Sequence, residues 1–244
     1  MENNHIVKSF DQELKQIENF ILEMGGLVEI QIHESVKALG NRDIELAKKV
    51  RDDDKTVDNL EIKIDELTLR TLALRQPVAT DLRSVICALK VASNLERIGD
   101  YAKNIAKRTQ VLADTNSVGT AEKTIKRMAD LVQKMVTDVL NAYVKKDIEM
   151  ADDIRLRDEE VDHMHNTLFR ELLTYMMEDP RNITPCMHML FIAKNLERMG
   201  DHTTAIAEKI HYVVKGALPK EKRPKGDKTS QMSVENTIEG NQYT

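Results

Sequence analysis

Hydrophobic residues recur at alternating steps of about three and four along most of this chain, the spacing of one face of an amphipathic helix. The pattern predicts a first long helix that ends near Leu39. A capping box of Ser9 and Gln12 is expected to open it, after a frayed segment from Met1 to Lys8. Gly25 and Gly26 interrupt the helix, and close packing against another helix is the expected reason.

The next two predicted helices form a hairpin. Asp43 is the expected N-cap of the second helix, Pro77 is expected to end it, and Thr80 is expected to cap the third. The second helix has a heptad seam of Leu46, Val50, Asp53, Val57, Leu60, Ile64, Leu67, Thr71 and Leu74. The seam of the third is Val91, Leu95, Ile98, Ala102, Ile105 and Leu112.

The second half of the chain repeats this plan. After a loop-like stretch at 113–120, a fourth helix is predicted from about Ala121 to Val144 and a fifth after Asp147, ending at Asp179-Pro180. Thr184 is expected to cap the sixth helix. The fifth seam is Met150, Ile154, Arg157, Val161, Met164 and Leu168, and the sixth is Ile192, Leu196, Met199, Thr203, Ile206, Ile210 and Val213.

The sixth seam is the third shifted by 101 residues, which indicates an internal repeat of about 100 residues. We therefore predict an all-α protein of two tandem three-helix bundles related by a pseudo-twofold repeat. The first bundle is expected over residues 1–115 and the second over 116–216. A polar tail, 217–244, is expected to be disordered, and its basic part is expected to be solvated, with contact to an acidic surface as the alternative.

Composition agrees with a helical protein and narrows its class. Only 9 glycines, 5 prolines and 4% aromatic residues occur, while 32% of residues are charged. A net charge of −5 argues against nucleic-acid binding, which needs a basic surface. Cys87 and Cys186 are expected to be reduced core residues. No signal peptide and no apolar stretch long enough to span a bilayer is evident, so we expect a soluble cytoplasmic protein.

One seven-residue phrase occurs twice and carries the candidate chemistry. Residues 94–100 read NLERIGD and residues 195–201 read NLERMGD, identical at six of seven positions. Each copy places a Glu and an Asp four residues apart, Glu96 with Asp100 and Glu197 with Asp201, on one face of a helix. Like charges at this spacing repel by a few tenths of a kcal/mol, so a bound cation is the simplest compensation.

Two further acidic pairs, Asp54 with Asp58 and Asp158 with Asp162, lie on the preceding helices. In each half the two pairs are equally distant from the hairpin turn, at Pro77 or Pro180, about 30 Å along the helices at 1.5 Å per residue. We therefore expect four carboxylates to meet at one level in each half. Their angles around the helices place them beside or opposite the seams, which predicts an open acidic patch on each bundle.

Other interpretations of these residues remain. The acids could be ordinary solvated faces, or Arg97 and Arg198 could pair with neighbouring helices. His163 and His202 follow the acids directly and are expected to be surface histidines, or else peripheral ligands. The absence of a Cys cluster argues against structural zinc. Gly99 and Gly200 cost about 1 kcal/mol each in a helix, which suggests close approach by a neighbour.

With these motifs the chain resembles the PhoU family, accessory regulators of phosphate uptake and phosphate signalling in bacteria. The resemblance covers about Phe10 to Gly216. It rests on Met24-Gly25-Gly26, Arg75-Gln76-Pro77, Thr80-Asp81-Leu82-Arg83, the two repeated phrases, Thr174-Tyr175-Met176-Met177-Glu178-Asp179 and Tyr212-Val213-Val214-Lys215-Gly216. The tail after Gly216 has no counterpart in the family pattern.

The resemblance implies two three-helix bundles, usually in a homodimer, and a non-enzymatic role. It implies an adaptor between the ATPase of the phosphate ABC transporter and a sensor histidine kinase, which keeps the phosphate-starvation response off when phosphate is plentiful. Such an adaptor would reach the membrane only through its partners. The acidic motifs of the family bind metal ions, in some members as multinuclear iron or zinc clusters. Those motifs correspond here to Asp54, Asp58, Glu96, Asp100, Asp158, Asp162, Glu197 and Asp201.

The metal could be Fe, Zn, Mn or Mg, and the sequence does not say which. Two alternatives to the adaptor stay open. One is a carboxylate-bridged di-iron enzyme, although such enzymes use Glu-x-x-His facing the bundle interior, and the phrase here has no His at that position. The other is a plain helical scaffold with salt-bridged faces.

Overall fold

Six long helices and one short 3-10 turn make up the described part of the chain. The structure is a computed structural model that describes residues 2–115, 117–221, 223, 225, 226 and 229, with side chains from residue 9 onward. The helices are α1 (Glu2–Asn41), α2 (Ile44–Arg75), α3 (Ala79–Leu112), α4 (Ala121–Lys145), α5 (Ile148–Glu178) and α6 (Ile183–Lys215), with η1 (Pro180–Asn182) leading into α6. The predicted all-α class is confirmed.

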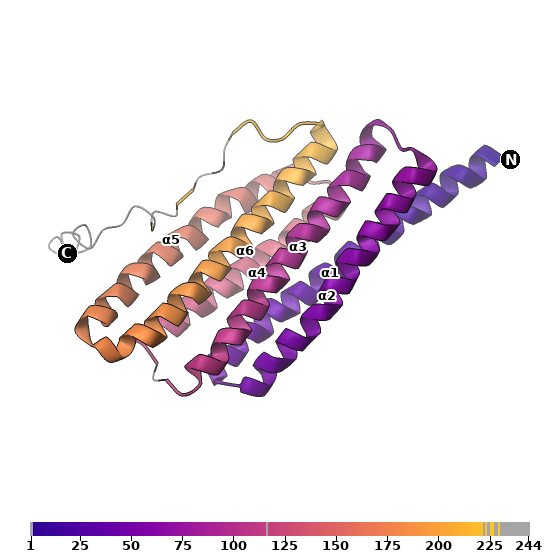
Figure 1. Ribbon diagram of the computed structural model, residues 1–244. Coiled ribbons are helices and arrows are strands. Elements are labelled where there is room, and N and C mark those ends of the chain that lie inside the picture. The colour runs from indigo at the N-terminus through magenta and orange to yellow at the C-terminus, as the bar shows by residue number, and fades with distance from the viewer. Residues whose placement is uncertain (1, 116, 222, 224, 227–228, 230–244) are drawn as a thin grey trace.

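The helices lie in two layers (Figure 1). α5, α6, α3 and α2 lie side by side in the front layer, with α1 and α4 behind them. α1 packs on α2 and α3, α4 packs on α5 and α6, and the halves meet where α3 contacts α6 and α1 contacts α4. α3 and α6 run antiparallel, since Cys87 lies against Lys209 and Arg108 against His188. This pseudo-twofold arrangement places the two repeated phrases opposite each other.

One hydrophobic core runs through both halves, from Ile17 in α1 to Ile210 in α6. The predicted seams of α3 and α6 are buried throughout. In α2 the seam is wrong at Asp53, which is exposed, and Asp54 takes its place in the interior. α5 makes the same choice, with Asp158 buried in place of Arg157. Leu74 is also exposed, because it lies near the end of α2.

The predicted cap at Asp43 is confirmed, and Asp147 caps the fifth helix in the same way. The Asp43 carboxylate accepts a hydrogen bond from Leu46 N at 2.9 Å, and Asp147 accepts one from Met150 N at 3.0 Å. The expected cap at Thr80 is wrong, because the Val78 carbonyl already accepts bonds from the next turn and α3 begins at Ala79. The cap at Thr184 is wrong as well, because η1 starts the turn three residues earlier.

The first helix begins earlier than predicted. α1 is helical from Glu2, so the expected frayed segment and the capping box at Ser9 are wrong. The Ser9 hydroxyl instead accepts a hydrogen bond from Arg75 at the end of α2. Close helix packing is confirmed at Gly25, where a Cβ atom would collide with Leu140 of α4, but nothing lies near a Cβ at Gly26.

The end of the chain departs from the expected disordered tail. Gly216 ends α6 with φ 73°, and the chain then returns along α5, where Glu221, Arg223 and Gly226 form hydrogen bonds. Residues 230–244 lie outside the described part of the structure. Disorder is therefore a wrong prediction for the stretch around Arg223 and Gly226.

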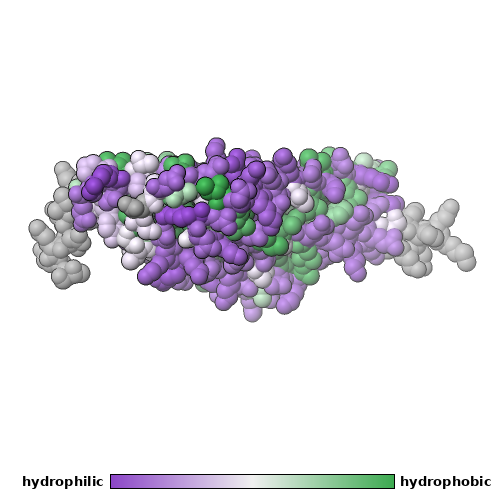
Figure 2. All heavy atoms as spheres, turned by 90° about the horizontal axis from the view of Figure 1, so that it is seen from below, coloured by the Kyte–Doolittle hydropathy of each residue, from purple (hydrophilic) through white to green (hydrophobic). Residues whose placement is uncertain are grey.

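Two further features bear on the class of protein. Cys87 and Cys186 are buried and free, as predicted. Within the described residues, no helix has a stretch that is both long and apolar enough to cross a bilayer. Figure 2 shows a largely hydrophilic face in which hydrophobic residues gather in a band on the right of the view.

The Asp43 cap gives a direct stability test. Replacing Asp43 with Ala removes the acceptor for the Leu46 amide and should lower the free energy of unfolding by about 1 kcal/mol. Asp43→Asn keeps an acceptor and should cost much less. Urea unfolding followed by circular dichroism measures both, and equal losses for the two variants would contradict the capping role.

Candidate functional site

Each half buries one aspartate against a glycine of the neighbouring helix. Asp54 of α2 is 2% exposed and faces Gly99 of α3, where a Cβ atom would lie 3.4 Å from Asp54 Oδ1 and 2.9 Å from Gln31 Oε1. Asp158 of α5 is 1% exposed, and a Cβ atom at Gly200 would collide with its Oδ1. The close approach expected at both glycines is confirmed, and the neighbour is a buried carboxylate.

In the first half, a lysine from α3 neutralises the buried aspartate. Lys103 Nζ lies 2.5 Å from Asp54 Oδ2 and 3.2 Å from Asp100 Oδ1. Gln31 of α1 donates a long hydrogen bond to Asp54 Oδ1 at 3.5 Å. Burial raises the pKa of Asp54, Lys103 opposes the rise, and the charges of Asp58 and Asp100 add to it. We call Asp54, Asp58, Glu96 and Asp100 the first acidic surface.

In the second half, the cation comes from beyond the helices. Arg223 donates to Asp158 through Nη1 and to Asp201 through Nη2. Gly226 N donates to Asp162 Oδ2 at 2.7 Å, and Lys194 Nζ lies 2.8 Å from Glu197 Oε2. We call Asp158, Asp162, Glu197 and Asp201 the second acidic surface.

These contacts decide two of the geometric predictions. Lys103 joins Asp54 to Asp100, and Arg223 joins Asp158 to Asp201, so acids from two helices do meet at one level in each half. The expected openness is wrong for half of the set, because the registers of α2, α5 and α6 take these side chains inward. The buried members are Asp54, Asp158, Asp162 and Glu197.

The neighbouring arginines and histidines behave differently in the two halves. Arg97 pairs with Glu96 at 3.4 Å and Asp100 at 3.5 Å, both on its own helix. Arg198 instead lies over the ring of Tyr101 on α3, 6.0 Å from its centroid. His163 is exposed, as expected, with Nε2 3.7 Å from Glu159.

His202 is an interface residue, so its expected surface position is wrong. Its Nδ1 lies 2.8 Å from Asn94 Oδ1 on α3, and its ring centroid is 5.6 Å from that of Tyr101. Burial lowers the pKa of His202, and the charges of Arg97 and Arg198 lower it further. His202 therefore joins the two repeated phrases.

Glu96 has the most strongly shifted pKa of the first acidic surface. Burial and the adjacent charge of Asp100 raise the pKa of Glu96 to about 7, and Glu61 contributes to the rise while Arg97 opposes it. Glu61 lies on α2, and burial raises its pKa as well. Sequence reasoning missed Glu61, which follows Asp58 by three residues, about one helical turn towards Pro77.

The residues of the two acidic surfaces suit a metal ion in their chemistry but not in their present spacing. Carboxylate oxygens are the ligands that Mg²⁺, Mn²⁺ and other hard cations prefer. Oδ1 of Asp158 is buried without a hydrogen-bond partner, so it has capacity for a ligand. Within the described residues, however, no three Asp, Glu, His or Cys side chains are close enough together to hold a metal ion. A hard cation would therefore fit only where Lys103 or Arg223 moves away.

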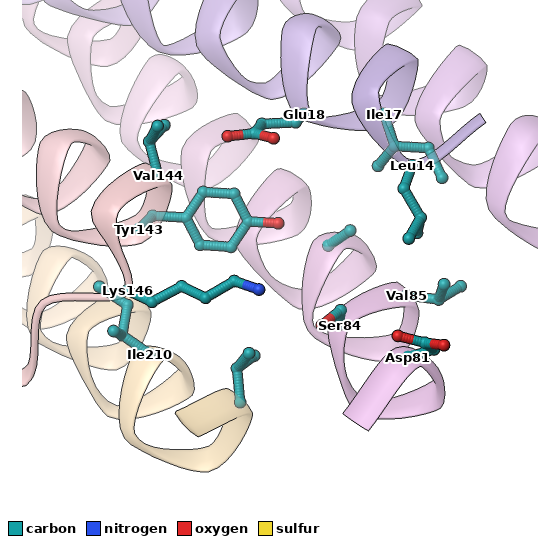
Figure 3. A pocket seen from close by; sticks show the side chains of 12 residues that line it. Leu14, Ile17, Glu18, Asp81, Ser84, Val85, Tyr143, Val144, Lys146 and Ile210 are labelled. Atoms are coloured by element: carbon teal, nitrogen blue, oxygen red, sulfur yellow. The ribbon is translucent and has the colours of Figure 1, made fainter. Parts of the chain in front are cut away.

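A pocket of about 160 Å³ lies elsewhere, between α1, α3, α4 and α6 (Figure 3). The hydroxyl of Tyr143 and the amine of Lys146 point into it, and Glu18 and Asp81 contribute carboxylates. Burial raises the pKa of Tyr143, with a further contribution from Glu18. Ser84 in its wall is about 22 Å along α3 from Gly99, so this pocket is separate from the acidic surfaces.

Comparison with known proteins identifies the family. Residues 21–109 and 125–210 each match the model of the PhoU domain. This chain belongs to the PhoU family. The two matched stretches correspond to the two halves of the internal repeat, and both include one copy of the repeated phrase.

Relatives and solved structures agree over nearly the full length. The chain is 48% identical over 94% of its length to a phosphate-specific transport system accessory protein PhoU homolog of Rhizobium meliloti, 97% of which is covered. A homolog of the same description from Caulobacter vibrioides is 46% identical over 93% of this chain and 99% of its own.

Crystal structures of two PhoU proteins share the fold. PhoU from Pseudomonas aeruginosa superimposes with a TM-score of 0.82 at 40% identity, covering 85% of this chain and all of that one. The phosphate transport system regulatory protein PhoU from Streptococcus pneumoniae gives a TM-score of 0.80 at 29% identity, covering 87% and 100%. The tandem PhoU architecture is thus established for this chain.

The Asp54–Lys103 pair leads to a stability prediction. Lys103→Met leaves a buried carboxylate without its cation and should lower the free energy of unfolding at pH 8 by about 2–4 kcal/mol. The loss should shrink as the pH falls, because Asp54 can then be protonated in the folded state. Combining Lys103→Met with Asp54→Asn should restore much of the loss in a double-mutant cycle measured by urea unfolding. Additive losses would contradict the pairing.

The raised pKa of Glu96 leads to a second prediction, in metal-free buffer. A carboxyl whose pKa rises from 4.5 to about 7 on folding stabilises the protein below pH 4.5 and loses that contribution as the pH rises to about 7. Glu96→Gln should therefore gain stability relative to the unaltered protein between pH 5 and pH 8. Glu160→Gln, at an exposed position, is the control, and parallel profiles for all three proteins would show that Glu96 is not perturbed.

Proposed function

We propose that this PhoU-family chain is a cytoplasmic adaptor that regulates phosphate uptake. It joins the ATPase of the phosphate ABC transporter to a sensor histidine kinase and keeps the phosphate-starvation response off when phosphate is plentiful. It acts as a homodimer and reaches the membrane through these partners. The observation that carries the proposal is near-full-length similarity to accessory proteins of the phosphate-specific transport system.

The ion pairs of the two acidic surfaces support an adaptor over an enzyme. A carboxylate-bridged metal enzyme uses its inward-facing acids as metal ligands. Here Asp54 and Asp158, the most buried acids of the two surfaces, are occupied by Lys103 and Arg223. In this arrangement Asp54 and Asp158 bind positively charged side chains.

Metal binding is the second part of the proposal. Fe, Zn, Mn or Mg ions would be held by the carboxylates of the first acidic surface (Asp54, Asp58, Glu96, Asp100) and of the second (Asp158, Asp162, Glu197, Asp201). Such an ion would supply positive charge that links helices or bridges to a partner. The unpartnered Asp158 Oδ1 supports this role in the second half.

A plain helical scaffold is the competing candidate, and the same ion pairs favour it. The two candidates differ in their response to metal, because a ligand that binds only the folded state raises the melting temperature. A scaffold should melt at the same temperature with and without millimolar Mn²⁺.

The adaptor role is tested in cells and with purified partners. Deleting the gene should switch on phosphate-scavenging genes in phosphate-rich medium, and unchanged expression would refute the regulatory role. The purified protein should retain the transporter ATPase and the sensor kinase in pull-downs. Asp58→Ala with Asp100→Ala should weaken retention if the first acidic surface takes part, while Asp11→Ala, on the outer face of α1, should leave it unchanged. Retention of neither partner by the unaltered protein would refute the adaptor.

A further inference from the structure

The chain after α6 binds along one stripe of α5. The carbonyl of Glu221 accepts a hydrogen bond from Arg155 at 2.6 Å, and Arg223 contacts Asp158. Gly226 donates to Asp162 at 2.7 Å and accepts from Asn166 at 2.5 Å. The partners on α5 therefore advance by three or four residues at each step, which is one face of the helix.

The segment and the stripe have the same length. Gly226 follows Glu221 by five residues, and a chain of that length reaches at most about 16 Å at roughly 3.3 Å per residue. Eleven residues of helix from Arg155 to Asn166 span about 16 Å at 1.5 Å per residue. The backbone of the segment is thus held at both ends, with the Arg223 side chain between them.

The fit at the far end is close. Gly226 is buried, and a Cβ atom there would lie 3.0 Å from Cβ of Asp162 and 3.6 Å from Cγ of Glu159. A larger side chain at this position would push the backbone away from Asp162 and Asn166. Gly226 therefore allows the segment to approach α5, as Gly200 allows Asp158 to approach α6.

The internal repeat explains why a cation from outside is needed only in the second half. Lys103 follows Asp100 by three residues and neutralises Asp54. The corresponding residue after Asp201 is Thr204, which donates a hydrogen bond to the Asp201 carbonyl and carries no charge. Arg223 contacts Asp158 and Asp201, the two counterparts of the acids that Lys103 contacts.

The first half also lacks the acceptor stripe. The counterpart of Asn166 on α2 is Ile62, which is 55% exposed and offers no hydrogen bond to a peptide backbone. The counterpart of Arg155 is Arg51, which donates to Gln110 at 3.3 Å. An extended basic segment is therefore matched to α5 and not to α2.

We propose that the second acidic surface is a binding site for a basic peptide, that the chain at Glu221, Arg223 and Gly226 is its built-in ligand, and that this ligand, which we call the strap, closes the surface to cations from solution. The two halves of the protein would then differ in function, because the cation of the first is a lysine side chain on a packed helix and that of the second is an arginine on a removable strap. The inference builds on the cation-binding role proposed above.

Manganese binding to the full-length protein tests the strap. Arg223→Ala removes the cation, and Gly226→Val keeps all charges but blocks the approach to α5. Both variants should bind one Mn²⁺ ion per chain more than the unaltered protein, counted from free Mn²⁺ by electron paramagnetic resonance. Lys225→Ala removes one positive charge at an exposed position and should leave the count unchanged. Adding Asp158→Asn to Arg223→Ala should abolish the gain.

A synthetic peptide of residues 217–229 provides a second, competition experiment. Added to the Arg223→Ala protein, it should displace the extra Mn²⁺, and the same peptide with Ala at 223 should do so at least about tenfold less well, because two charge-assisted hydrogen bonds are lost. No gain of Mn²⁺ in either variant, or equal displacement by the two peptides, would overturn the strap. The count for the unaltered protein reports on the metal role at the first acidic surface, so the two proposals can fail separately.

Discussion

A carboxylate buried between two helices needs a cation, and this requirement organises both halves of the protein. An uncompensated buried charge costs several kcal/mol, which is a large part of the stability of a typical domain. Asp54 and Asp158 are placed inside by the register of α2 and α5, and glycines at 99 and 200 give them room. Each glycine lowers the stability of its helix relative to alanine. The glycine and the buried aspartate therefore belong together, because the glycine is useful only where the carboxylate occupies the space beside it.

The two halves satisfy this requirement by different routes. Lys103 is part of α3 and cannot leave its carboxylates without distorting the helix or changing its rotamer. Arg223 lies on a segment that leaves α6 at Gly216 and is held by a few hydrogen bonds from α5. A segment outside the helical core opens at a lower free energy than a packed helix. The two halves thus use the same acidic positions with a cation from a packed helix in one and from the chain after α6 in the other.

The sequence predicted the geometry that follows from fixed helical dimensions and missed what depends on side-chain choice. The level of the acidic pairs follows from equal distances to Pro77 and Pro180, since every helical residue rises by the same amount. Asp54 could not be told from Asp53, because Val50 and Val57 fix a seven-residue repeat that either position can fill. Arg223 lies in a stretch without periodicity, so no pattern linked it to Asp158. Lys103 was recognisable only as an i+3 neighbour of Asp100.

The near-identity of the two phrases follows from their position at the pseudo-twofold axis. In each copy the acids face the acidic surface on one side of the helix. The next residue along the chain faces the opposite helix, and His202 contacts Asn94 and Tyr101 there. Consecutive residues lie about 100° apart around a helix, so Asp201 can face the second acidic surface while His202, in the same turn, faces α3. Positions just beyond the phrase carry only one of these roles, and there the copies differ, with Lys103 in one and Thr204 in the other.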